Sequence, residues 1–121
     1  MAQVWYYTTA AGENPVSKFL DSLSEKQQAK ILRVIHSIKD YGLNAALPHI
    51  KKLTGTPLWE IRILGKDNIR VFYVIPGKEL ILVLHGFIKK KQKTPIKEIT
   101  IALERLGEWQ YRHRPLTNDI I

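Results

Sequence analysis

The sequence predicts one α+β domain, in which an N-terminal helical hairpin packs on an antiparallel sheet of about four strands and a C-terminal helix closes the fold. Three observations predict it: helically spaced apolar residues with capping signals over residues 14–42, strand-like apolar runs separated by turns over residues 58–88, and helical spacing again after Pro95. A chain of 121 residues, 45% of them hydrophobic, can bury one core. We therefore expect a single domain over residues 1–110 and a loose tail over residues 111–121.

The first two helices are predicted from their start and stop signals. Asn14 is placed as an N-cap and is followed by a proline at the first helical position. A second helix begins at Ser24, which forms a capping box with Gln27, and ends at Gly42. Because the two helices follow each other directly, we expect them to form a hairpin.

The predicted strands occupy the N-terminus and the middle of the chain. A first candidate covers residues 4–9, and residues 43–57 read as a connection because they hold proline and glycine without a sustained period. Three further candidates cover residues 58–64, 69–75 and 80–88, joined by the turn sequences GKDN and PGKE. Such short turns predict an antiparallel meander.

Alternation along these strands separates an aliphatic core face from a second face that carries charge. A register across the PGKE turn in which paired position numbers sum to 153 is expected, and it places Arg70 opposite Val83, with His85 diagonal to Arg70. We expect this second face to be open to solvent. Its predicted members are Arg62, Arg70, Phe72, His85, Phe87 and the lysines that begin at Lys89.

The position of Arg62 depends on the loop that precedes Arg70. Only a loop of three or five residues, with Gly65 or Asn68 in a left-handed conformation, brings Arg62 beside Arg70, because a one-residue slip sends a side chain to the opposite face.

Positive charge is concentrated in the middle of the chain. Residues 51–97 contain eleven Lys or Arg and three acidic residues, which equals the net charge of +8 of the whole chain. A concentrated positive field suits a polyanion, with nucleic acid first and an acidic protein second. A lysine-rich surface that only maintains solubility is the alternative.

Several functional classes are disfavoured by what the sequence lacks. It has no cysteine, so disulfides, thiolate nucleophiles and Cys-based zinc sites are excluded, and its four histidines lack metal-ligand spacing. No apolar run is long enough for a membrane span or a signal peptide. We therefore expect no metal, no cofactor, no membrane association and a cytoplasmic location.

Three segments resemble the HigB-like, phage-derived branch of the RelE/ParE superfamily of toxin–antitoxin toxins. They are KKLTGTPLWEIRI at residues 51–63, NIRVFYVI at 68–75 and LHGFIKKKQKTP at 84–95, followed by a helix with an E...A..R pattern. The resemblance covers roughly residues 4–110. It implies a RelE-like fold with a small twisted antiparallel sheet, and a metal-independent endoribonuclease that cuts messenger RNA on the ribosome and is neutralised by a cognate antitoxin, expected to be a helix-turn-helix protein.

The resemblance and the strand pattern together select candidate site residues. Arg70 corresponds to the strand arginine that RNA-cutting relatives use at the scissile phosphate, and His85 is a candidate acid or base because histidine titrates near neutrality. The candidate catalytic residues are Arg70, His85, Lys89 and Lys91. The candidate RNA-binding residues are Lys51, Lys52, Arg62, Phe87, Lys90 and Lys93.

Two other functional classes stay open. ParE-like relatives inhibit DNA gyrase without cutting RNA, and a non-catalytic RNA-binding protein or an inactive phage remnant would carry the same charge. The general base is also open, because the sequence has no C-terminal tyrosine that clearly matches the position in other RNA cutters, and Tyr111 is only a loose match.

Overall fold

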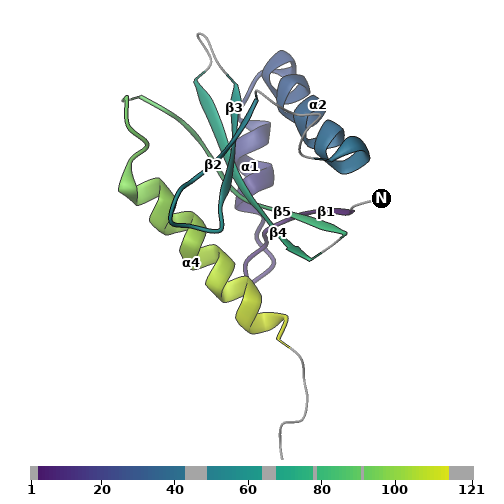
Figure 1. Ribbon diagram of the computed structural model, residues 1–121, viewed down its shortest axis with the longest axis vertical. Coiled ribbons are helices and arrows are strands. Elements are labelled where there is room, and N and C mark those ends of the chain that lie inside the picture. The colour runs from purple at the N-terminus through teal and green to yellow at the C-terminus, as the bar shows by residue number, and fades with distance from the viewer. Residues whose placement is uncertain (1–2, 43–48, 64–67, 78, 91, 115–121) are drawn as a thin grey trace, which may run out of the picture.

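The computed structural model describes residues 3–42, 49–63, 68–77, 79–90 and 92–114 (Figure 1). In chain order its elements are β1 (Gln3–Tyr6), α1 (Pro15–Asp21), α2 (Glu25–Tyr41), β2 (Ile50–Lys52), β3 (Trp59–Ile63), β4 (Ile69–Gly77), β5 (Leu80–Ile88) and α4 (Ile96–Arg112).

The strands of the described residues form a five-stranded mixed sheet in the order β1-β5-β4-β3-β2. β1 pairs in parallel with β5, while the other neighbours are antiparallel. The predicted antiparallel sheet of about four strands is therefore wrong. β2 lies in the predicted connection, where three residues are too few to show an alternating pattern.

The predicted N-terminal helical hairpin is also wrong. α1 packs mainly on β5 and α2 on β3, so each helix buries its apolar face against the sheet. α4 packs on β5 from the other side: Gly86 of β5 faces Phe19 of α1, whereas the neighbouring His85 bonds to α4. Successive strand residues point to opposite faces, and helices accordingly cover both faces of the sheet (Figure 1).

The predicted helix signals are present in the structure. The Asn14 side chain accepts a bond from the Ser17 amide, and Ser24 forms both bonds of its capping box with Gln27. Gly42 ends α2 with a φ of +87°, which a residue without Cβ adopts freely. None of the described helices is long and apolar enough to cross a membrane.

The C-terminal helix differs from its predicted form. It runs to Arg112 and so includes the first two residues of the predicted tail. Residues 115–121 of that tail lie outside the described residues. The helix buries Ala102 and Leu106, whereas Ile96, its first residue, is 80% exposed.

The strand registers determine which side chains meet. Arg62 lies directly opposite Arg70, as predicted, and Asn68 has a φ of +46°. Arg70 lies opposite Phe87 instead of Val83, so the predicted register across the second turn is wrong. Between Phe72 and Tyr73 the register shifts by one residue in β5, a bulge that strict alternation cannot foresee. His85 is nevertheless diagonal to Arg70, because it pairs with Phe72.

The predicted open face is closed over β5. Phe72 and Phe87 are 0% and 6% exposed and pack edge to face at 5.2 Å, because α4 lies over this part of the sheet. The expectation that these two rings stand on a solvent-exposed face is wrong. The same face is accessible farther along, where a cavity opens beside β2, β3 and β4.

Candidate nucleic-acid interface

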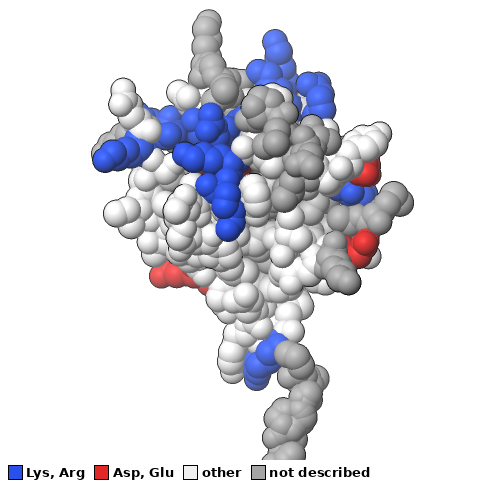
Figure 2. All heavy atoms as spheres, in the orientation of Figure 1, with Lys and Arg blue, Asp and Glu red and all other residues white. Residues whose placement is uncertain are grey.

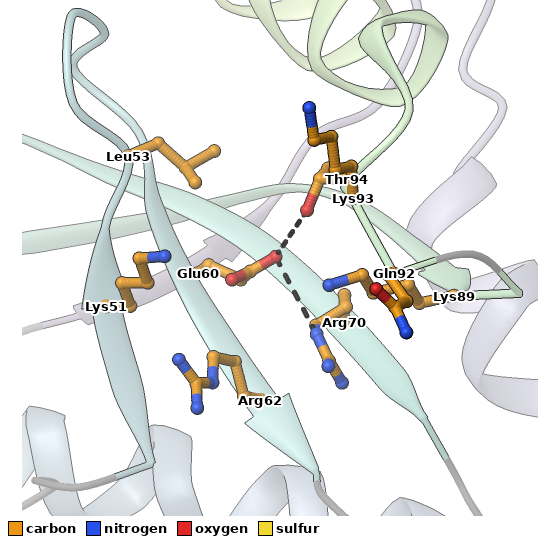
Figure 3. A pocket seen from close by; sticks show the side chains of 9 residues that line it. All are labelled: Lys51, Leu53, Glu60, Arg62, Arg70, Lys89, Gln92, Lys93 and Thr94. Atoms are coloured by element: carbon orange, nitrogen blue, oxygen red, sulfur yellow. Dashed lines mark hydrogen bonds and ion pairs between the residues drawn. The ribbon is translucent and has the colours of Figure 1, made fainter.

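A cavity of about 380 Å³ lies over the β2–β3–β4 end of the sheet and the segment that connects β5 to α4 (Figure 3). We call it the cationic cavity. Its lining residues are Lys51, Leu53, Glu60, Arg62, Arg70, Lys89, Gln92, Lys93 and Thr94. Five of these nine are Lys or Arg and one is acidic, so the lining carries a formal charge of +4.

Two arginines form the floor of the cationic cavity. Arg62 of β3 and Arg70 of β4 are directly opposite each other across the strand pair, an arrangement in which like charges destabilise a sheet. Within the described part of the chain, the Nε atoms of both side chains are buried and have no hydrogen-bond partner. A buried N–H group without a partner is unfavourable, so each guanidinium keeps one donor that is available to an anion.

Glu60 is the acidic residue in this lining. It is 3% exposed, and one carboxylate oxygen lies 3.8 Å from Arg70 Nε and 3.5 Å from the Thr94 hydroxyl (Figure 3). Lys51 of β2 lies directly opposite Glu60 and lines the same cavity. Glu60 thus compensates one charge and leaves the cavity strongly positive.

Lysines surround the entrance to the cationic cavity. Lys89 follows directly after β5, and its amide donates to the Asn68 carbonyl at 2.8 Å, which fixes the end of the strand beside the loop into β4. A second depression of about 280 Å³ shares Arg70, Lys89 and Gln92 with the first and adds Asn68 and Lys90. Figure 2 shows Lys and Arg gathered toward one end of this face of the molecule.

His85 belongs to a different cluster. Its Nε2 lies 2.6 Å from Glu98 Oε1, and Arg105 donates to His85 Nδ1 at 3.2 Å and to the Leu84 carbonyl at 2.8 Å. His85 also stacks on Phe87 at 5.6 Å. We call His85, Glu98 and Arg105 the α4 clamp, because they fasten α4 to β5. His85 is not among the described residues that line the cationic cavity.

The protonation state of His85 follows from its partners. Burial lowers its pKa, the bond to Glu98 opposes this effect, and the Arg105 charge adds to it, so the pKa is below its ordinary value. Because Arg105 can only donate, Nδ1 must accept and the ring proton sits on Nε2, which donates to Glu98. The geometry and the pKa direction agree on a neutral imidazole.

The other predicted site residues divide between the cavity and its surroundings. Lys51, Arg62, Arg70, Lys89 and Lys93 line the cationic cavity, and Lys90 lines the adjoining depression. Lys52 instead lies over the Trp59 ring at 5.8 Å, and Phe87 is buried. Lys91 lies outside the described residues.

Sequence reasoning did not assign Glu60, Gln92 or Thr94 to the site. Glu60 was detectable, because it precedes Arg62 by two residues and strand alternation puts both on one face. Gln92 and Thr94 lie in an irregular segment, where no period predicts direction. Among the described residues, no three His, Cys, Asp or Glu side chains are grouped so that they could hold a metal ion.

Comparison with known families gives one match. Residues 18–107, which are 90 of the 121 residues, match the family model described as phage-derived protein Gp49-like (DUF891). The match includes β2 to β5, most of α4 and every residue that lines the cationic cavity. No curated protein matches the sequence.

Proposed function

The chain belongs to the Gp49-like phage-derived family, which is part of the RelE/HigB-like toxins of toxin–antitoxin systems, and from this premise we propose that it is an endoribonuclease that cuts messenger RNA on the ribosome. The family implies an antitoxin as a partner. We further propose the chain's ribonuclease activity, its dependence on the ribosome and the residues of its site.

The observation that carries the proposal is the pair Arg62–Arg70. Two guanidinium groups lie opposite each other with buried, unpartnered Nε atoms in a cavity of charge +4. Such a pair is unfavourable in the free protein, and an anion with several oxygens removes the cost by accepting from both side chains. An RNA phosphate has this chemistry, and the lysines along the rim suit its neighbouring phosphates.

Cleavage without a bound metal needs few groups. The 2′-oxygen attacks the adjacent phosphorus, negative charge grows on the two non-bridging oxygens, and the 5′-oxygen leaves with a proton. We assign the growing charge to Arg62 and Arg70, because fixed guanidinium forks hold two oxygens at once. Lys89 lies beside Arg70 in both depressions and is the proton donor to the 5′-oxygen in this proposal.

His85 has no direct step in the proposed reaction. Both of its ring nitrogens have partners on α4. We propose that it holds α4, and with it the segment that carries Gln92, Lys93 and Thr94, in place over the cavity.

The test is to induce the wild type and the double variant Arg70→Ala, Lys89→Ala in a bacterial host and to map the 5′ ends of cellular RNA. We expect the wild type to produce new 5′ ends inside translated frames. The double variant should not produce them. The matched control is Lys26→Ala, Arg33→Ala, which removes the same two residue types from exposed positions of α2 and should leave the cuts unchanged.

Two other results separate the alternatives. Growth arrest with intact messenger RNA and altered DNA supercoiling would support a gyrase inhibitor and contradict the proposal. RNA binding without new ends, in cells and with purified programmed ribosomes, would support a non-catalytic RNA-binding protein.

A further inference from the structure

We propose that Glu60 is the general base that removes the proton from the attacking 2′-hydroxyl, an inference that rests on the ribonuclease function proposed above. The proposal is based on one arrangement: a buried, weakly bonded carboxylate lines a cavity whose other charged residues are all cations.

The carboxylate of Glu60 has unused capacity to accept. A charged carboxylate has about four acceptor positions, and a buried one is normally satisfied by short, charge-assisted bonds of about 2.7–2.9 Å. Glu60 instead has a hydroxyl at 3.5 Å and a guanidinium nitrogen at 3.8 Å, both from the same oxygen. Among the described residues, therefore, no partner occupies this acceptor fully, and a proton donor that enters the cavity can bond to it.

A purely structural role explains this geometry poorly. If Glu60 served to hold Arg70, we would expect two parallel N–H···O bonds of the kind that arginine and carboxylates form. Arg70 Nε has no hydrogen-bond partner in the described ranges, and Arg70 donates from a terminal nitrogen to the Ile69 carbonyl at 3.1 Å. Glu60 and Arg70 therefore line one cavity without a tight bond between them. This is the arrangement expected of two groups that both contact a substrate.

The position of Glu60 relative to the cations matches the reaction. It lies one alternation step from Arg62 along β3, and its oxygen is 3.8 Å from Arg70 (Figure 3). A phosphate held by the two arginines is thus beside the carboxylate, and the 2′-hydroxyl lies on the ribose joined to that phosphate. The described residues of the cavity include no histidine, and His85 is engaged by α4.

The proposed step balances without a further reactant. The 2′-oxygen transfers its proton to Glu60 and forms a bond to phosphorus, the bond from phosphorus to the 5′-oxygen breaks, and that oxygen takes a proton from the Lys89 ammonium. The products are a 2′,3′-cyclic phosphate and a 5′-hydroxyl. Proton exchange with water then restores the Glu60 carboxylate and the Lys89 ammonium.

The experiment uses the full chain with programmed ribosomes and a synthetic messenger RNA that contains the mapped cut site. Glu60→Gln keeps the shape of the side chain and removes the base, and we expect a loss of about 10²- to 10⁴-fold in the single-turnover cleavage rate. Glu60→Asp, which keeps the carboxylate, should retain more activity than Glu60→Gln. Equal cleavage by wild type and Glu60→Gln would overturn the proposal and leave the ribonuclease function standing.

Binding separates a base from a residue that only positions Arg70. An RNA with a 2′-deoxyribose at the cut site cannot react, so its affinity reports on the cavity alone. Glu60→Gln should bind it as tightly as the wild type or more tightly, because the substitution removes a negative charge beside a phosphate. If affinity falls together with the cleavage rate, Glu60 holds Arg70 and is not the base.

A modified leaving group gives the sharpest distinction. When sulfur replaces the 5′-oxygen at the cut site, the leaving group no longer needs a proton, so the slow cleavage by Lys89→Ala should recover. Glu60→Gln should stay slow on the same RNA, because its 2′-hydroxyl must still lose a proton. Recovery of Glu60→Gln would contradict the assignment, whereas a wild type that cuts neither RNA would contradict the ribonuclease function itself.

Discussion

The cationic cavity and the α4 clamp lie on the same face of the same sheet, but they differ in how fully their polar groups are hydrogen-bonded. In the clamp His85, Glu98 and Arg105 are joined by bonds of 2.6 and 3.2 Å, and both histidine nitrogens have partners. In the cavity, two buried guanidinium Nε atoms have no hydrogen-bond partner among the residues that the structure describes. The polar groups of the clamp satisfy one another, and we propose that those of the cavity are satisfied when an anion enters it.

This difference separates stability from function along one surface. Polar groups that satisfy one another stabilise the folded state, whereas groups left unpartnered lower stability and are retained where they bind or react. Substitutions in the clamp should therefore change the free energy of unfolding, and substitutions in the cavity should change RNA cleavage. Four predictions test this separation, and they are ordered from the largest expected effect to the smallest.

Arg70→Lys should give the largest effect. It keeps a positive charge near Glu60 and removes the fork that can hold two phosphate oxygens, so we expect the single-turnover rate to fall by about 10²- to 10³-fold. The free energy of unfolding should change little, as measured by urea titration. The matched change in the clamp, Arg105→Lys, should leave the cleavage rate per folded molecule near that of wild type. Equal losses of rate in the two variants would abolish the distinction between the regions.

Arg105→Ala should have the opposite effect: it should lower the free energy of unfolding and leave the cleavage rate per folded molecule unchanged. It removes the donor to the Leu84 carbonyl and to His85 Nδ1, and bonds from a charged donor contribute about 1.5–3 kcal/mol. Because Arg105 is partly exposed, we expect a loss of about 2 kcal/mol in the free energy of unfolding. The exposed control Arg33→Ala should change it by less than about 0.5 kcal/mol. A folded Arg105→Ala protein that has lost its cleavage would show that the clamp takes part in the chemistry.

The clamp also predicts how stability depends on pH. Its histidine has a lowered pKa in the folded protein, while the unfolded chain has the ordinary value of about 6.5. Between the folded pKa and about 6.5 the unfolded state binds more protons, so stability falls as pH falls through this window. The groups that face the ring are Glu98 and Arg105, both on α4. Urea midpoints from about pH 8 to 5 should show this decline in the wild type.

His85→Gln removes that contribution and keeps the carboxylates of the chain. The difference between the two pH curves then isolates the histidine, and we expect the variant to be less sensitive between about pH 6.5 and 5. Identical slopes in the two proteins would mean that burial and the Arg105 charge do not hold the ring neutral in the folded state.

The smallest predicted effect concerns the salt dependence of RNA affinity and tests where the cavity ends. Lys51 lines it, whereas the next residue, Lys52, lies over the Trp59 ring. If Lys51 meets a phosphate, Lys51→Ala should reduce the slope of log affinity against log salt by about 0.7 for single-stranded RNA. Lys52→Ala is the control and should leave that slope unchanged. Equal changes in both variants would indicate a diffuse positive surface without a defined phosphate track.

Local signals predicted the parts of the fold that depend on neighbours in the sequence. The caps at Asn14 and Ser24 and the pairing of Arg62 with Arg70 follow from residues that lie close together along the chain. The parallel pairing of β1 with β5 could not be foreseen in this way, since its partners are 77 residues apart, as in Gln3 and Leu80. The sequence also did not indicate the bulge near Leu84, which shifts the pairing of β4 with β5 by one residue.

The candidate site was predicted in the same uneven way. Alternation put Arg62, Arg70 and His85 on one face, and the structure keeps them there. What divides that face is α4, which lies over His85 and Phe87 and stops short of Arg70. Its clamp residues Glu98 and Arg105 are seven positions apart, on the same side of the helix, but their spacing alone does not identify the strand that they meet.

The parallel edge formed by β1 and β5 also bears on the order in which the chain can assemble. β1 is synthesised before the strand it pairs with, whose paired residues follow 77 positions later, so this part of the sheet has a high contact order. The β3–β4 hairpin, which carries the acidic residue and both arginines of the cavity, pairs locally and can form sooner. The floor of the cavity can therefore exist before its walls, because Lys89 and Lys93 follow β5. A nascent chain gains the full positive cavity only after the segment that follows β5 has been synthesised.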